Sequence, residues 1–173
     1  MKKLSIIISA VALAATLAGS AAAQKKTTKK PTTKKPVTLV APLDVRTARE
    51  HADIQLSNVN DYLAKLTPVA ADLETAIGYQ KAGQLRPSIA AGVDRNRANL
   101  VKSVHDIGLA LNTLESEFRT KPALAKYLST IQGITDFAAQ SEDAASQGQF
   151  VASKDPLRKV VLKLTDTLAL MSR

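Results

Sequence analysis

Hydrophobic residues recur at alternating spacings of three and four along most of the chain, which is the pattern of amphipathic helices that pack on one another. The first such stripe falls within residues 44–82 and is interrupted only by Arg49. Its members are Val45, Ala52, Leu56, Val59, Leu63, Leu66, Ala70, Leu73 and Ile77. Pro68 lies inside it and either kinks one helix or separates two, because proline removes a backbone hydrogen bond. Since the stripe keeps its phase across Pro68, we expect one kinked helix over 44–82 that ends at Gly83.

Three more helices are predicted after Gly83. The second begins at Pro87 and ends before Pro122, with the stripe Ala90, Val93, Arg97, Leu100, Val104, Ile107, Leu111, Leu114 and Phe118. The third begins at Pro122 and ends at Gly148, with Leu124, Tyr127, Ile131, Ile134, Ala138, Ser141 and Ala145 facing inward. The fourth has Asp155 as its N-cap and Pro156 at its first position. Its stripe is Leu157, Val161, Leu164, Leu168 and Met171.

No stretch alternates with period two, so the chain is expected to be all-α, an antiparallel up-down four-helix bundle with a kink or break at Pro68. At about 1.5 Å per residue, the first two helices would span roughly 58 and 48 Å and the last roughly 26 Å. The stripe on the two long helices therefore needs extra cover. A fold back at Pro68, the loop at 149–154, a second copy of the chain or another protein partner would supply it.

The first 23 residues have the pattern of a secretory signal peptide. Lys2 and Lys3 precede an uncharged run over residues 4–18, and Ala21 and Ala23 form an A-x-A cleavage motif. We expect cleavage after Ala23 and a periplasmic or secreted mature protein. No later segment approaches 18 uninterrupted apolar residues, so no transmembrane segment is expected in the mature chain.

Residues 24–43 are predicted to form a disordered basic tail before a helical domain at 44–173. The tail consists mainly of lysine, threonine and proline and has no acidic residue. Its lysines are Lys25, Lys26, Lys29, Lys30, Lys34 and Lys35. From residue 44 onward 16 basic residues face 15 acidic ones, so the excess positive charge of the mature chain lies in the tail. The tail could contact an anionic envelope polymer or lipid surface, or act only as a spacer. Nucleic acid is not an expected partner, because the tail has no aromatic residue for base stacking.

Catalytic chemistry is not indicated. The chain has no cysteine, which excludes disulfides, thiolate metal sites and cysteine nucleophiles. It contains no H-E-x-x-H motif, calcium loop or glycine-rich phosphate loop. Glu115 and Glu117 are two residues apart on a predicted helix, so their side chains diverge and are expected to be solvated. The sequence therefore predicts a non-enzymatic binding or scaffold protein of the cell envelope without a cofactor.

A periplasmic haem or metal carrier of the four-helix-bundle type is the alternative. His51, near the start of the first helix, and Met171, near the end of the last, would lie at the same end of the bundle. However, His51 and His105 both fall outside the stripes and are expected on the surface, whereas Met171 continues a stripe. We therefore predict no cofactor or metal ligands.

Arg97 is a charged residue where the stripe requires an apolar one. Folding the first two helices about residues 84 and 85 places Arg97 near Asp72 and Glu74. The sequence thus predicts a partly buried ion pair that would fix the register of the helices. The alternative is that Arg97 lies near the end of the bundle and reaches solvent.

Overall fold

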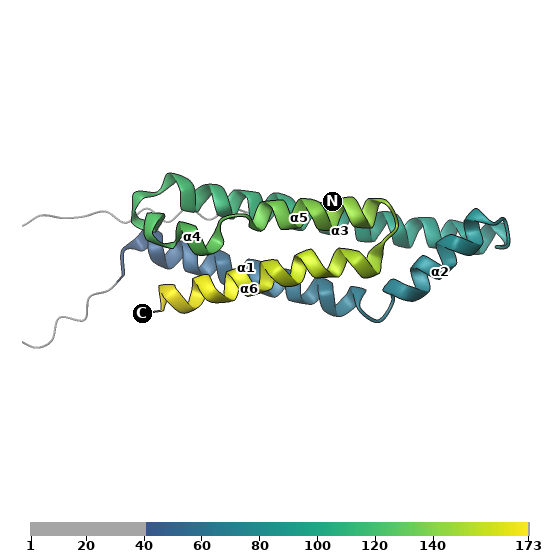
Figure 1. Ribbon diagram of the computed structural model, residues 1–173, viewed down its shortest axis with the longest axis horizontal. Coiled ribbons are helices and arrows are strands. Elements are labelled where there is room, and N and C mark those ends of the chain that lie inside the picture. The colour runs from purple at the N-terminus through teal and green to yellow at the C-terminus, as the bar shows by residue number, and fades with distance from the viewer. Residues whose placement is uncertain (1–40, 173) are drawn as a thin grey trace, which may run out of the picture. The chain divides into compact units, whose positions relative to one another are not determined.

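The computed structural model of the protein describes residues 41–172, and every regular element in this range is helical (Figure 1). The elements are α1 (Leu43–Leu66), α2 (Ala70–Lys81), α3 (Pro87–Thr120), the 3-10 helix η1 (Pro122–Tyr127), α4 (Leu128–Ile131), α5 (Ile134–Ser146) and α6 (Phe150–Met171). The all-helical expectation is confirmed. The predicted signal peptide and nearly all of the predicted tail lie outside the described residues. No helix within 41–172 is both long and apolar enough to cross a membrane.

The four longest helices share one hydrophobic core. Helix α1 packs against α3 and α6, and α5 packs against the same two helices. In Figure 1, α3 runs back alongside α1, and α6 runs back alongside α5. The shorter α2 packs against α3 and α6. The largest fully buried side chains are Phe118, Phe150, Leu66, Leu111, Leu124, Ile131, Ile134, Leu157, Leu164, Val59, Val104 and Val160.

The predicted stripes identify the buried faces of the helices. All seven predicted positions between Leu124 and Ala145 are buried. On α3, Val93, Val104 and the last four stripe positions are buried, whereas Ala90, Arg97 and Leu100 are half-buried. The period of three and four thus located most of the core, because only one face of each helix meets its neighbours.

Pro68 separates two helices, so the expected single kinked helix is wrong. Helix α1 ends at Leu66 and α2 begins at Ala70. In the turn between them, the Val69 N–H donates to the Leu66 carbonyl at 3.1 Å. Pro68 has no N–H with which to continue α1. Leu66 and Ala70 are both fully buried on either side of the turn, so the phase of the stripe could not distinguish a kink from a break.

The third predicted helix is interrupted at Gly133. The segments η1 and α4 precede this glycine, and α5 begins immediately after it. Gly133 has a φ of 90°, in the left-handed region that residues other than glycine rarely adopt. The chain therefore changes direction here, although the buried face continues from Ile131 to Ile134.

The last helix begins earlier than its local sequence predicts. Helix α6 starts at Phe150, and Pro156 lies inside it rather than at its first position. Phe150 and Ser153 are fully buried, so packing holds the turns that precede the proline. The expected loop at 149–154 is therefore mostly helical. Because α2 packs against α6, this early start covers part of the stripe on α2.

Candidate functional site

Glu115 on α3 is the one charged residue among the buried side chains of residues 41–172, with 2% of its surface exposed. Its carboxylate accepts hydrogen bonds from the Gly133 N–H at 3.0 Å and the Thr135 N–H at 3.1 Å. It also accepts from the Thr135 hydroxyl at 2.8 Å and from the guanidinium of Arg119. The two N–H groups belong to the N-terminus of α5, where no side-chain cap bond is formed at Gly133. Glu115 therefore caps α5 from a neighbouring helix.

The environment of Glu115 keeps its carboxylate ionised. Burial alone raises the pKa of Glu115, but the hydrogen bonds from Gly133, Thr135 and Arg119 outweigh burial and hold the pKa below the ordinary value of 4.5. A carboxylate with a lowered pKa and four donors around it is a poor proton donor near neutral pH. The expectation of a solvated Glu115 is thus wrong, because the carboxylate is buried and caps α5.

Glu74 on α2 provides a second carboxylate cap. Its Oε1 accepts the Val151 N–H at 2.7 Å, in the first turn of α6. The N-cap residue of α6, Gln149, makes no side-chain cap bond of its own. Helices α5 and α6 therefore each receive a cap from a glutamate of an earlier helix, Glu115 of α3 and Glu74 of α2.

Arg97 does not meet the carboxylates predicted for it. It is half-buried, and its Nη2 donates to the carbonyl of Ser146, the last residue of α5, at 2.6 Å. Glu74 is hydrogen-bonded to α6, and Asp72 is exposed in the first turn of α2. Within the described residues, neither carboxylate forms an ion pair with Arg97. The predicted pair is replaced by a cation at the negative end of a helix, an arrangement that stabilises the last turn.

Two histidine–glutamate contacts join neighbouring helices on the surface. Nδ1 of His51 lies 2.9 Å from Oε2 of Glu117, and Nδ1 of His105 lies 2.9 Å from Oε1 of Glu142. The two imidazoles are about half exposed, at 51% and 50%, which confirms their predicted surface position. Lys121 also donates to Glu117, at 2.6 Å. Burial raises the pKa of Glu117, but the hydrogen bonds from Lys121 and His51 outweigh burial and leave the pKa below its ordinary value.

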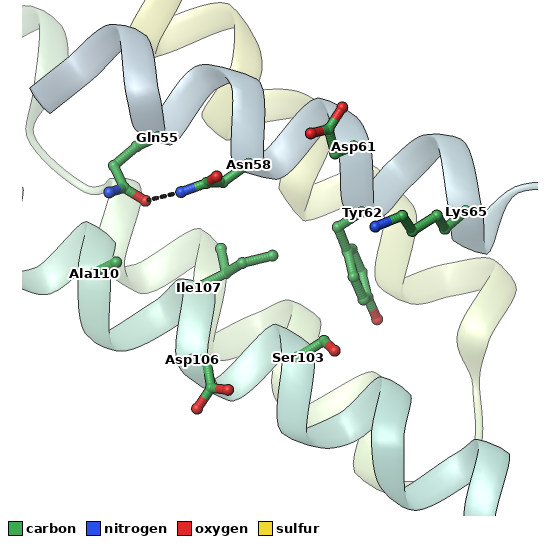
Figure 2. Close-up of a pocket in the computed structure, with 9 residues that line it drawn as sticks. All are labelled: Gln55, Asn58, Asp61, Tyr62, Lys65, Ser103, Asp106, Ile107 and Ala110. Carbon is green, nitrogen blue, oxygen red and sulfur yellow. Dashed lines mark hydrogen bonds between the residues drawn. The ribbon is translucent and has the colours of Figure 1, made fainter. Parts of the chain in front are cut away.

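A groove of about 370 Å³ lies between α1 and α3 (Figure 2). Its lining residues are Gln55, Asn58, Asp61, Tyr62, Lys65, Ser103, Asp106, Ile107 and Ala110. Asn58 donates to Gln55 at 3.3 Å on one rim, and Asp106 accepts from Lys102. The Tyr62 hydroxyl donates to the Leu100 carbonyl at 3.3 Å, and burial raises the pKa of Tyr62 to about 12. The phenol of Tyr62 is therefore neutral near pH 7 and is held against the backbone of α3.

A second groove, of about 550 Å³, lies beside Arg97 between α3 and α5. Its other charged residues already have partners. Lys102 pairs with Asp106, His105 contacts Glu142, and Asp94 accepts from Gln80. Side chains of both charge signs line this groove.

Neither the side chains of the described residues nor the comparisons with known proteins identify a reaction or a bound metal. The described part of the chain contains no group of three or more histidine, aspartate or glutamate side chains that could hold a metal ion. No known protein-family model, curated protein or solved structure matches the chain. The function must therefore be argued from the geometry of the domain and from the sequence.

The sequence reasoning missed both carboxylate caps. Glu115 lies 18 residues from Gly133, and Glu74 lies 77 residues from Val151. Their partners come from different helices, so no local motif marks them. The available signal is that glycine precedes α5 and glutamine precedes α6, since neither residue is a strong side-chain cap. Helices without a local cap point to a donor from elsewhere in the fold.

Proposed function

We propose that the chain is an exported, non-enzymatic binding or scaffold protein of the cell envelope, with a lysine-rich tail that tethers it to anionic surfaces. The proposal is supported by the observation that the buried polar side chains form hydrogen bonds to other groups of the domain. Glu115, Ser141, Ser153 and Thr167 are all hydrogen-bonded to other groups of the domain. Among the described residues, no buried polar side-chain atom lacks a partner.

This use of polar groups favours a structural domain over an enzyme. Active sites typically hold ionisable groups whose pKa values are shifted toward neutrality by burial or by like charges. Here the buried carboxylate has a lowered pKa and serves as a helix cap. The fold proposed for the domain is an antiparallel up-down four-helix bundle. It is supported by the packing of α1 and α5 against both α3 and α6.

The adhesive part of the proposal rests on the tail. Six lysines without a compensating acid precede a domain whose basic and acidic residues nearly balance. If each lysine near an anionic surface is worth about 1 kcal/mol, the tail supplies at most about 6 kcal/mol, equivalent to a dissociation constant of tens of micromolar. Such binding should weaken sharply as the Debye length falls from about 30 Å at 0.01 M salt to about 8 Å at 0.15 M.

Cosedimentation of the mature chain with anionic vesicles at these two ionic strengths tests the tail. Replacing its six lysines by glutamine should weaken the binding at low salt. The matched control removes the same charge from exposed residues of the domain, namely Arg46, Arg49, Lys65, Lys126, Arg158 and Lys159. The control should retain most of the binding. Equal losses in the two variants would contradict a tether located in the tail.

The absorption spectrum and metal content of protein purified from its own host distinguish the proposed scaffold from a haem or metal carrier. The proposal predicts neither a Soret band nor a stoichiometric metal. Either finding would favour the haem or metal carrier.

A further inference from the structure

The turn between α2 and α3 exposes apolar side chains at one end of the helical domain. We define residues 78–95 as the hairpin tip, which Figure 1 shows beyond the turn that joins α5 to α6. Tyr79 and Ile89 are 51% and 52% exposed, and Leu85 between them is half-buried. Ile89 lies one helical turn before the buried Val93 on α3. Ala90, the stripe position beside it, is half-buried, so Ile89 stands exposed at the edge of the stripe.

The hairpin tip also carries an excess of positive charge. Lys81, Arg86 and Arg95 are exposed, whereas residues 75–93 contain no acidic side chain. The acids that border this stretch are both hydrogen-bonded within the domain. Glu74 accepts the Val151 N–H at 2.7 Å, and Asp94 accepts from Gln80 at 2.9 Å. The tip as defined thus carries three exposed cations and one acid, Asp94, a net charge of +2.

We infer that the hairpin tip docks on the surface of an anionic lipid bilayer. Apolar and aromatic side chains flanked by lysine and arginine suit the boundary between headgroups and acyl chains, where the cations meet lipid phosphates. An anionic polymer would use the cations and leave Tyr79 and Ile89 without a role. A second copy docked tip to tip would bring like charges together, which opposes association.

The inference rests on the proposed function, since it requires an exported protein that meets an envelope membrane. It adds a second contact to the one proposed for the tail. A single weak membrane signal gives reversible binding, whereas two together give stable anchoring. The tip and the tail would provide these two signals.

The charge of the tip is tested in the full mature chain after its six tail lysines have been replaced by glutamine. Binding is measured by cosedimentation with phosphatidylcholine vesicles that contain or lack phosphatidylglycerol. Adding Lys81→Gln, Arg86→Gln and Arg95→Gln should weaken binding to the anionic vesicles by about fivefold per cation, or about 100-fold in total. The matched control, Arg46→Gln, Arg49→Gln and Lys126→Gln, removes equal charge from exposed sites elsewhere and should change binding by less than about threefold.

Apolar insertion is tested with a fluorescent reporter. The chain has no tryptophan, so Ile89→Trp introduces a single indole at the tip. Its emission should shift to the blue with anionic vesicles and stay unchanged with neutral ones. Leu162→Trp, at a position on α6 that is 64% exposed, should show no shift with either. The double variant Tyr79→Gln, Ile89→Gln should lose at least tenfold in binding, and Ile54→Gln, Leu162→Gln should not.

Three results would overturn the inference. Equal losses in the tip and control charge variants would mean that any cation of the domain contributes. An unshifted Ile89→Trp emission, together with binding to polyglutamate, would identify a polymer partner. Absence of vesicle binding by the tail-neutralised chain, with binding by the intact chain, would refute the tip and leave the proposed tail tether standing. Circular dichroism checks that each variant is folded.

Discussion

The glutamate cap on α5 predicts a large effect of one polar side chain on the stability of the domain. Glu115→Ala removes the acceptor of two backbone N–H groups and a hydroxyl. Each orphaned N–H costs about 1 to 1.5 kcal/mol here, because Gly133 and Thr135 are half-buried and water can reach them in part. Loss of charge at the N-terminus of α5 adds about 1 kcal/mol. The free energy of unfolding should therefore fall by about 3 to 4 kcal/mol.

Urea unfolding at pH 7, followed by helical circular dichroism, measures this loss. Glu50→Ala removes an exposed glutamate from α1 and should change the free energy of unfolding by no more than about 0.5 kcal/mol. The loss in free energy of unfolding for Glu115→Gln should lie between those for Glu115→Ala and Glu50→Ala. The glutamine amide oxygen can accept hydrogen bonds from only some of the groups that donate to Glu115. Hydrogen exchange at the Gly133 and Thr135 amides should accelerate in both Glu115 variants.

The pH dependence gives an independent test of the same cap. Because the folded-state pKa of Glu115 is lowered, its contribution to stability is fully present above the ordinary value of 4.5. It is lost as the pH falls through the lowered folded-state pKa. The stability gap between the wild type and Glu115→Gln should thus be constant near neutral pH and narrow in acid. Equal stability of Glu115→Ala and Glu50→Ala at pH 7 would refute the reasoning, as would a gap that does not depend on pH.

Three smaller perturbations test the other contacts in the same unfolding assay. Glu74→Ala should cost about 1 to 2 kcal/mol, because it removes the cap of α6, and should accelerate amide exchange at the start of that helix. Gly133→Ala should cost about 1 to 2 kcal/mol because of its positive φ, whereas Gly92→Ala inside α3 should stabilise by about 0.5 to 1 kcal/mol. Arg97→Ala should cost about 1 kcal/mol through its lost bond to α5, and a double-mutant cycle with Asp72→Ala should give a coupling within about 0.3 kcal/mol of zero. A loss at Gly92 equal to that at Gly133, or a coupling above 1 kcal/mol, would contradict these assignments.

The buried faces of the helices were predictable because they depend on a repeating local pattern. Most of the stripe on α3 is buried as predicted, including Val104, Leu111 and Phe118. The boundaries of the helices were harder to predict from the sequence. Pro68 ends a helix although the stripe continues, and Pro156 lies inside α6 although its local sequence resembles a helix start. Periodicity records which side of a helix is buried, and it does not record where the chain turns.

The caps depend on contacts between distant residues, so the sequence alone did not reveal them. The start of α6 is fixed by the burial of Phe150 and by Glu74, which belongs to another helix. Arg97 was placed opposite Asp72 on the assumption that a continuous first helix folds back on the second. The break at 67–69 and the end of α5 at Ser146 replace that partner by a backbone carbonyl.

Fractionation of the native host, with N-terminal sequencing of the recovered protein, tests the proposed function most directly. The account predicts a mature chain that begins at Gln24 and is found in the envelope fraction. Raising the ionic strength of the wash should weaken its electrostatic contacts and release part of it. Recovery from the cytoplasm with Met1 still in place would contradict export, and a cleaved chain that never associates with the envelope, even at low ionic strength, would contradict the tether.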